Sequence, residues 1–446
     1  MSRTSSQLFS EHFSEGALQE VVELHLQDGV ARGVDGTGYD GFMSRRDDEV
    51  GLISRRALTG SYRFSPYRQK LLLKDAFSPP RQVSIPTLRD RVALRALNNF
   101  LSEIFHDCRP QHAHPIITSV LSSVAEMREG DCFIKLDIQS FYDAINHEIL
   151  LKTLRSRMRT ENPLSMISSA LRTPTGATVA SKKANETGVP QGLSISNILS
   201  SIYLRTIDDR YGSMLGLKYH RYVDDVLCIC AGREAQHFAK DISKRLKREK
   251  KLSCHQLGTG KSLICEPGSS VLYLGYSIGG DKVTVRQETE KKLMTSIMEI
   301  IFGATSDNVE RAIWRANLRI TGCRFSDSTV GWIFYFSQIN DISLLTKMDV
   351  QIRNAVVRKF GQERANNVKR LVKAYHQIRH NYRDSTYFPN FDTYSREQKI
   401  AHLQLLAPGK FRDLEAKSDQ QISRIFGASV WREVKRMERD TLNSFS

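Results

Sequence analysis

The sequence has no long hydrophobic run. None of its apolar stretches approaches the roughly 18 residues that a helix needs to span a bilayer. Its polar start, MSRTSSQLFSEHF, has neither the basic region nor the apolar core of a signal peptide. It also has no internal repeat and no low-complexity segment. These absences argue against a membrane-embedded or collagen-like chain, and we expect a cytoplasmic protein without membrane contact.

Cysteine is scarce and unpatterned. The seven cysteines are odd in number and include no CxxC pair, which argues against a disulfide framework and against a zinc site. Cys228 and Cys230 lie two apart in an apolar run, as alternate residues on one face of a strand do, so we expect buried structural thiols. His112 and His114 have no partner at metal-ligand spacing, and we expect no metal there.

Acidic residues are outnumbered by basic ones. The 446 residues include 65 Lys and Arg against 49 Asp and Glu, a formal charge of +16, which predicts attraction to polyanions. Residues 240–251 carry seven basic and two acidic residues, and residues 355–384 carry eight and two. The first segment suits a solvated helix face as well as nucleic acid. In the second segment, aromatic and His side chains interleave with the Lys and Arg residues, which favours RNA binding. The predicted RNA-binding residues are Lys369, Arg370, Lys373, Tyr375 and Arg379.

The pattern of apolar residues predicts an α+β fold of two or three subdomains. Helical spacing occurs over residues 89–104, strand and helix signals alternate in the middle third, and the chain is mainly helical after residue 287. The middle third is expected to contain strands at 132–138 and 272–278, helices at 150–158 and 196–210, and a hairpin over 219–231.

Three aspartates give the strongest chemical signal. Asp224 and Asp225 stand at the tip of the predicted hairpin between apolar strands, where adjacent carboxylates repel each other and lose solvent unless a cation compensates. Asp137 ends another strand signal and supplies a third ligand if that strand lies beside the hairpin. Two other acidic pairs lack this context and are interpreted as a loop pair and as the solvated end of a helix: Asp47-Asp48 and Asp208-Asp209.

Such a carboxylate cluster suits Mg²⁺, and two ions about 4 Å apart support in-line nucleotidyl transfer. Between Asp137 and the hairpin lies Gly188-Val189-Pro190-Gln191-Gly192, followed by a helix. Taken alone, this loop is an ordinary turn, with Ser196 as the N-cap of the helix.

The motifs in their order resemble those of reverse transcriptases. Asp137-Ile138-x-x-Phe141-Tyr142-Asp143, the Gly188–Gly192 loop, Tyr222-Val223-Asp224-Asp225 and Leu274-Gly275-Tyr276 resemble palm motifs A, B, C and E. Upstream, Gly33-Val34-Asp35-Gly36, Lys74, Arg81 and Ile85-Pro86-Thr87-x-x-Asp90-Arg91 resemble the fingers of the bacterial group II intron-like enzymes, and Gly331-Trp332, Tyr335-Phe336 and Asp349 resemble their thumb.

This resemblance implies a right-hand polymerase. Residues 1–130 would form the N-terminal region and fingers, 131–284 the palm with an inserted fingers segment at 155–187, 285–384 a helical thumb and 385–446 a C-terminal extension. It implies an RNA-directed DNA polymerase that uses dNTPs and two Mg²⁺ ions to make DNA on an RNA template.

Individual roles follow from the matched positions. Asp137, Asp224 and Asp225, with the Ile138 carbonyl, would hold the metal ions, and Lys261 would give a proton to the departing pyrophosphate. Lys74 and Arg81 would hold the triphosphate, Tyr142 would exclude a ribose 2′-OH, and Gln191 would lie beside the templating base pair. Leu274, Gly275 and Tyr276 would grip the primer end.

Departures from the intron enzymes narrow the subgroup. Residues 109–114 replace their usual Gly-Phe-Arg motif, and no HNH nuclease motif follows the thumb. Arg319-Ile320-Thr321-Gly322 before Gly331-Trp332, together with residues 387–392, resemble the "unknown group" enzymes of antiphage defence, which suggests a dedicated structured non-coding RNA as template. An RNA-dependent RNA polymerase is disfavoured by Tyr142 and Val223. Untemplated or protein-primed synthesis, and an idle RNA-binding protein on a polymerase scaffold, stay open.

Overall fold

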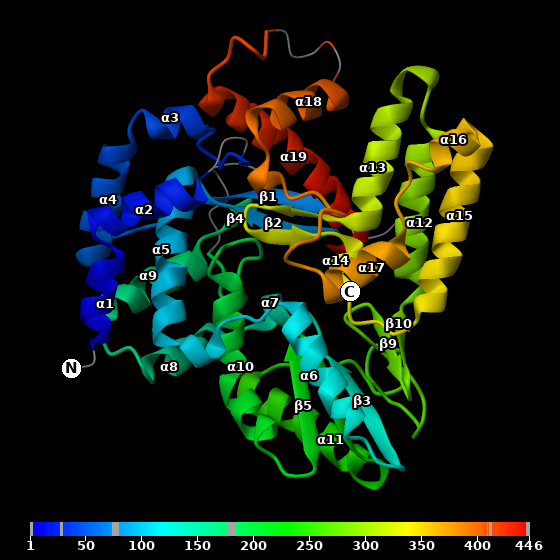
Figure 1. Ribbon diagram of the computed structural model, residues 1–446. Helices are drawn as coiled ribbons and strands as arrows, with labels where there is room; N and C mark the ends of the chain where they lie inside the picture. Colours follow the sequence, from blue (N-terminus) through cyan, green and yellow to red (C-terminus); the bar gives the residue numbers. More distant parts are fainter. Residues whose placement is uncertain are drawn as a thin grey trace. The chain divides into compact units, whose positions relative to one another are not determined.

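The computed structural model describes residues 3–26, 30–73, 80–176, 184–407, 409 and 413–442. The chain forms two compact units, residues 1–267 (unit 1) and 268–446 (unit 2). Both mix helices and strands, so the predicted α+β class is confirmed (Figure 1). The helices described in unit 1 are α1 (Ser5–His12), α2 (Glu15–His25), α3 (Tyr39–Met43), α4 (Arg46–Leu58), α5 (Leu88–Ile104), α6 (Ala113–Ala125), α7 (Phe141–Ala144), α8 (His147–Arg155), α9 (Glu161–Arg172), α10 (Ser196–Gly212) and α11 (Gly232–Lys250).

The central sheet of unit 1 has the order β5-β6-β3-β7, and its neighbouring strands are antiparallel. Its strands are β3 (Asp131–Asp137), β5 (Leu217–Tyr222), β6 (Asp225–Ala231) and β7 (Leu263–Ile264). Helices α6, α10 and α11 pack against it (Figure 1). The predicted hairpin is confirmed as β5 and β6, and Cys228 and Cys230 are buried on β6 as expected.

A smaller sheet has the order β2-β1-β4, and Arg81 and Ile85 of the motifs expected in the fingers lie on β2. Its strands are β1 (Tyr67–Leu72), β2 (Arg81–Ile85) and β4 (Thr175–Gly176). The buried Asp90 carboxylate accepts hydrogen bonds from Tyr62 Oη at 2.8 Å and from the Ser65 N–H at 3.0 Å. A Cβ at Gly33 would lie 2.6 Å from Thr87 Cα, so only glycine allows this approach to the N-cap of α5. These residues of the motifs expected in the fingers therefore have a structural role in unit 1.

Unit 2 begins with a meander, β10-β9-β8, and continues with helices. Residues 272–278 were expected to form one strand, and this prediction is wrong. Leu274 (φ 48°) and Gly275 (φ 81°) form a two-residue turn, because positive φ at both positions reverses the chain into a hairpin. The described strands are β8 (Val271–Tyr273), β9 (Tyr276–Gly279), β10 (Lys282–Val285), β11 (Cys323–Phe325) and β12 (Ser328–Val330).

The helices described in unit 2 are α12 (Gln287–Phe302), α13 (Val309–Thr321), α14 (Trp332–Tyr335), α15 (Ile342–Phe360), α16 (Gln362–Ala365), α17 (Leu371–His380), α18 (Arg396–Leu406) and α19 (Asp419–Leu442). Helix α12 packs against both α13 and α15 (Figure 1). The C-terminal helices share a core with α13, in which Trp314, Phe391, His402 and Phe426 form an aromatic cluster. Across the described residues of both units, none of the helices has the length and apolar character of a membrane span.

Candidate active site

The three aspartates meet at one end of the central sheet. In the antiparallel pair β3–β6, Asp137 lies directly opposite Asp225, and Asp225 also pairs with Tyr222 of β5. Val223 and Asp224 are therefore the two-residue turn of the hairpin, and the Ile138 N–H donates to the Asp224 carbonyl at 3.1 Å. The strand of Asp137 lies beside the hairpin, which was the condition for a common site.

Val223 holds a backbone conformation that its side chain disfavours. Its φ is 56°, in a region where a β-branched residue is a rare outlier and where the tight hairpin turns favour glycine. Arg221 supports the turn, because its Nη1 donates to the Val223 carbonyl at 2.8 Å while its guanidinium forms two hydrogen bonds with Asp208. The two other acidic pairs differ from their predicted environments. Asp208 was interpreted as part of the solvated end of a helix, which is wrong because it binds Arg221. Asp47 and Asp48 were interpreted as a loop pair, but they lie in the first turn of α4.

The pKa of Asp225 is raised. Burial raises its pKa to about 7, the charges of Asp137 and Asp224 add to the rise, and Lys135 opposes it. Lys135 Nζ lies 3.4 Å from Asp225 Oδ2. Because Lys135 precedes Asp137 by two positions, both side chains lie on one face of β3. A bound cation would relieve this repulsion and favour the ionised carboxylate.

A loop before β7 brings two further basic groups to Asp137. His255 Nε2 lies 3.5 Å and Lys261 Nζ 3.7 Å from Asp137 Oδ2, and the two basic groups are 3.4 Å apart. The loop is fixed by backbone groups, since the His255 N–H donates to the Asp137 carbonyl at 2.9 Å and the Asp137 N–H donates to Ser262 Oγ at 3.0 Å. The structure thus places Lys261 beside the predicted metal ligands.

The chemistry of these donors fits Mg²⁺. Mg²⁺ prefers carboxylate and carbonyl oxygens, and three carboxylates on neighbouring strand ends supply them. Within the described residues, no group of three or more His, Cys, Asp or Glu side chains has the arrangement of a preformed metal site. The ligand set Asp137, Ile138, Asp224 and Asp225 therefore stays a prediction.

The loop of Gly188 and Val189 is bound to α7. The Gly188 N–H donates to the Ile145 carbonyl and the Val189 N–H to the Tyr142 carbonyl, both at 2.8 Å. Gly188 has φ 85°, and a Cβ there would lie 3.0 Å from the Asp143 carbonyl oxygen. The prediction of Ser196 as N-cap is wrong, because the α10 N-cap is Ile195 and Ser196 Oγ instead donates to the Pro190 carbonyl at 2.6 Å, which closes the loop.

Two of the predicted nucleotide-binding residues, Arg81 and Gln191, meet at the other end of this loop. Arg81 Nε donates to Gln191 Oε1, and the Ser84 N–H donates to the Gln191 carbonyl at 2.7 Å. A Cβ at Gly192 would lie 2.6 Å from Val83 Cγ1, so glycine is needed for the loop to reach β2. Tyr142 Oη donates to Asn197 Oδ1 at 2.7 Å. Lys74 lies outside the described residues.

The predicted primer-grip residues form the β8–β9 turn of unit 2. The side chains of Leu274 and Tyr276 are buried. Tyr276 Oη donates to the Tyr335 carbonyl, and Tyr335 Oη donates to the Leu274 carbonyl at 2.9 Å. The turn is therefore fixed to α14, and its contact with a primer stays a prediction.

The predicted RNA-binding residues lie on and just before α17, and one of them needs correction. Tyr375 is 4% exposed and its hydroxyl donates to the Ile339 carbonyl at 2.6 Å, so its ring has no free face for a base. Arg379 donates to that same hydroxyl at 2.6 Å. The aromatic residue beside the lysines is Tyr387, whose ring centroid lies 5.2 Å from Lys369 Nζ and 4.9 Å from Lys373 Nζ.

Lys369 and Lys373 line a groove of about 640 Å³ in unit 2. Its basic side chains are Arg353, Lys369, Arg370 and Lys373. Asp349 also borders the groove, but its two carboxylate oxygens accept the N–H groups of Leu371 and Val372 at the start of α17. The groove is therefore strongly basic.

Comparison with known proteins finds a family that is similar to part of the chain. Residues 73–278 match the family described as reverse transcriptase (RNA-dependent DNA polymerase). The matched segment is similar to a reverse transcriptase domain. This segment contains Lys74, Arg81, Tyr142, Gln191, Lys261 and the three aspartates.

Curated relatives are similar at low identity. Protein YkfC of Escherichia coli (strain K12) is 27% identical over 248 residues, which cover 46% of this chain and 64% of YkfC. Group II intron-encoded protein LtrA of Lactococcus lactis subsp. cremoris is 25% identical over 219 residues, which cover 47% of this chain and 35% of LtrA. The chain thus spans less than two thirds of the length of these relatives. Among solved structures, apo telomerase from Candida tropicalis is similar with a TM-score of 0.40 and 12% identity, covering 82% of this chain and 69% of that one.

Three residues of the site were missed from the sequence. Lys135 was detectable, because a strand places residues two apart on one face. His255 and Asn197 carry no such signal, since each reaches the site through a loop or a helix start that only the folded chain brings there.

Proposed function

We propose that the protein is an RNA-directed DNA polymerase that adds deoxynucleotides to a primer on an RNA template. The observation that carries this proposal is the register of β3 and β6, which puts Asp137 opposite Asp225 with Asp224 in the adjoining turn, inside the reverse transcriptase domain. A chain that used this fold only as a scaffold would have no need for mutually repelling, partly buried carboxylates. This argues against an idle RNA-binding protein.

Asp137, Asp224, Asp225 and the Ile138 carbonyl are the groups that would hold two Mg²⁺ ions. Bound there, the ions supply the positive charge that activates an attacking hydroxyl and stabilises the leaving oxygen. The other proposed roles are filled by side chains that do not hold the ions. In this proposal Arg81 holds the triphosphate, Tyr142 crowds the 2′ position of the sugar, and Lys261 gives the departing pyrophosphate a proton. The position of Lys261 Nζ, 3.7 Å from Asp137 Oδ2, supports the last of these roles.

We further propose a structured RNA as partner and a role in antiphage defence. The RNA proposal is supported by the basic groove around Lys369, Arg370 and Lys373. The defence role rests on the sequence motifs alone, and the cytoplasmic location rests on the lack of long apolar runs in the sequence. Protein-primed or untemplated synthesis is the second candidate, and it differs by making DNA without added primer or template.

Mg²⁺-dependent primer extension with dNTPs on an RNA template tests the polymerase. We expect Asp224→Asn and Asp225→Asn each to abolish extension while the protein stays folded, since each removes repulsion and little packing. Asp47→Asn with Asp48→Asn is the matched control, an acidic pair on α4 outside the site, and we expect normal extension. Full extension by the Asp224/Asp225 double variant would overturn the proposal. Product made without template or primer would favour the second candidate.

A further inference from the structure

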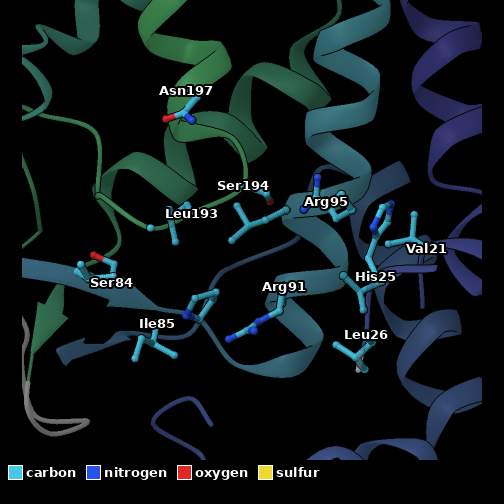
Figure 2. A pocket seen from close by; sticks show the side chains of 15 residues that line it. Val21, His25, Leu26, Ser84, Ile85, Arg91, Arg95, Leu193, Ser194 and Asn197 are labelled. Carbon is cyan, nitrogen blue, oxygen red and sulfur yellow. The ribbon is translucent and has the colours of Figure 1, made fainter. Parts of the chain in front are cut away.

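Helix α10 contacts the candidate active site at two separate points. Its second residue, Asn197, accepts the hydrogen bond from Tyr142, and Figure 2 shows Asn197 at the start of this helix. Near the other end of the helix, Asp208 binds the guanidinium of Arg221 on β5. The helix is fixed in the core of unit 1, since Tyr203 at its centre is fully buried. It therefore offers Arg221 an anchor that does not move with the turn.

Arg221 joins this helix to the turn that carries Asp224. Its Nε and Nη2 donate to the two carboxylate oxygens of Asp208 at 2.8 and 2.5 Å, while its Nη1 donates to the Val223 carbonyl at 2.8 Å. Tyr219, two residues earlier on β5, donates to the same carboxylate at 2.9 Å. The Arg221 side chain is 10% exposed, so solvent screens this pair less than a surface ion pair. The guanidinium is thus held in one orientation, toward the turn.

The backbone of the turn explains why it needs such support. Of the two described residues of the turn, Val223 and Asp224, only Val223 has a positive φ, of 56°. This is the pattern of a type II′ turn, whose first central position favours Gly. Such strain persists only where the surrounding structure fixes the conformation, and the Arg221 hydrogen bond holds the carbonyl of the strained residue. The next carbonyl, that of Asp224, accepts the Ile138 N–H at 3.1 Å, so the shape of the turn also decides how Asp224 meets β3.

We propose that Arg221 and Asp208 are positioning residues for the metal ligands, and that they act by holding Val223 in its strained conformation. With the Val223 carbonyl held, Asp224 keeps its place beside the end of β3, where Asp137 lies. Both residues act through the turn and not on a reacting group. The part of this inference that concerns the metal rests on the proposed function, whereas the part that concerns the turn does not.

Amide hydrogen exchange tests the turn without any need for activity. NMR of protein that contains isotope-labelled isoleucine follows the Ile138 N–H at the turn, and Ile134 in the middle of β3 reports on the rest of the sheet. We expect Arg221→Met to speed exchange at Ile138 by at least about tenfold relative to Ile134, the factor that loss of a hydrogen bond from a charged group gives. Arg221→Lys loses the paired geometry and Asp208→Asn loses one acceptor, so each is expected to speed this exchange by a smaller factor.

Metal binding tests the consequence for the carboxylates. Mn²⁺ is the probe, because carboxylate oxygens suit it as they suit Mg²⁺, and electron paramagnetic resonance measures the free ion. We expect Arg221→Met to raise the Mn²⁺ concentration for half-saturation by up to about tenfold, because Asp224 is no longer held in place. A direct effect of charge has the opposite sign, since removal of a nearby cation favours metal binding. A lower Mn²⁺ concentration for half-saturation in Arg221→Met would therefore overturn the proposal.

Val223→Gly connects the effect to the strained turn. Gly adopts positive φ without strain, so the turn is expected to keep its shape without the Arg221 contact. The rise in the Mn²⁺ concentration caused by Arg221→Met is therefore expected to be smaller in protein that also has Val223→Gly. An equal rise in both backgrounds would mean that Arg221 does not act through the strained turn, and the proposal would fail.

Arg205→Met is the matched control. Arg205 lies on the same helix as Asp208, and its ion pairs are with Asp107 and Asp209. We expect Arg205→Met to leave exchange at Ile138 and Mn²⁺ binding unchanged. Effects as large as those of Arg221→Met would mean that loss of any ion pair on α10 disturbs the turn, which contradicts a specific role of Arg221.

The remaining outcomes separate this inference from the polymerase proposal. Equal acceleration at Ile138 and Ile134 in Arg221→Met would show a purely structural role and overturn the inference, as would a wild type that binds no Mn²⁺. A wild type that binds Mn²⁺ and shows the expected changes in the variants, yet extends no primer, counts against the polymerase alone. Normal exchange and Mn²⁺ binding in Arg221→Met, with normal extension by the wild type, count against the positioning role alone.

Discussion

Tyr142 of α7 donates a hydrogen bond to Asn197, the second residue of α10, across 2.7 Å. Burial raises the pKa of Tyr142, and nearby Asp224 adds to the rise, so the hydroxyl stays protonated and remains a donor. This bond limits rotation of the ring that we propose excludes the 2′-OH. If Tyr142 excludes the 2′-OH as proposed, Asn197 acts as a positioning residue for the choice of sugar.

The proposed exclusion of ribonucleotides by Tyr142 is tested by comparing dNTP with rNTP in single-nucleotide extension. We expect Tyr142→Ala to admit ribonucleotides because the ring is gone, and Tyr142→Phe to exclude them still. Asn197→Ala and Tyr142→Phe each lose the hydrogen bond between these side chains, so each is expected to lower the preference for dNTP by up to about tenfold while dNTP stays preferred. The effects of Tyr142→Phe and Asn197→Ala should not add, because both remove the same bond. An unchanged preference in Tyr142→Ala would show that the motif is misaligned.

Lys135 sets how readily Asp225 ionises. Its charge lowers the pKa of Asp225, against burial and the other aspartates, which raise it. We expect Lys135→Met to raise the Mg²⁺ concentration for half-maximal extension at pH 7, by about fivefold for the first unit by which the pKa of Asp225 rises and by about tenfold for each further unit. The difference in this Mg²⁺ concentration between the wild type and Lys135→Met is expected to narrow at pH 8.5, where the Asp225 carboxylate ionises again. Lys135→Arg keeps the charge and serves as control, and a Met variant with normal Mg²⁺ dependence at pH 7 contradicts the assignment.

His402 makes the stability of unit 2 depend on pH. Burial lowers its pKa to about 4, and Nε2 is buried without a hydrogen-bond partner in the described chain. An unfolded chain takes up a proton near pH 6.5, so the contribution of neutral His402 is complete above that pH and falls as the pH drops towards 4. We expect the free energy of unfolding to fall by up to about 1.4 kcal/mol per pH unit in this window.

Chemical denaturation between pH 4 and pH 7 measures this dependence. His402→Phe fills the same aromatic cluster without a titratable group, and we expect a flatter profile. His380→Phe, on the exposed side of α17, is the control and is expected to keep the wild-type slope. Equal slopes for wild type and His402→Phe would contradict the burial argument.

The basic groove is tested by RNA binding. Replacing Lys369, Arg370 and Lys373 with Ala is expected to weaken RNA binding and to flatten its salt dependence by about 0.7–0.9 in log–log slope for each phosphate that the protein no longer neutralises. Replacing Lys240, Lys244 and Lys247 on α11 removes the same charge from the other basic segment. Extension of a saturating preannealed primer–template is expected to survive in both variants. If the variant of Lys369, Arg370 and Lys373 keeps its RNA affinity and salt slope, the groove is a solvated surface that does not bind RNA.

The sequence predicted the parts of this fold that depend on local pattern. The strand ending at Asp137, the hairpin with Asp224 at its turn and the helix beginning at Ser196 all follow from residue spacing and apolar runs. It failed where backbone geometry overrides side-chain pattern. Leu274 and Gly275 sit in an apolar run that predicts one strand, yet positive φ at both positions turns the chain back.

Long-range contacts were the other limit. Tyr375 stands among bases in the sequence, and nothing local shows that its hydroxyl reaches Ile339 in the core. Tyr387 reaches Lys369 and Lys373 from a separate segment. Charge composition therefore located the basic surface, but not which aromatic ring faces it.

The aromatic cluster around His402 bears on how this chain can be shortened or joined to another protein. Phe391, His402 and Phe426 come from residues that the motifs assign to an extension, yet they pack with Trp314 of α13 in one core. A deletion after residue 384 would strip α13 of that cover and leave an apolar face open to aggregation. The last helices thus share one core with α13, and a tag or fusion partner is best added after α19.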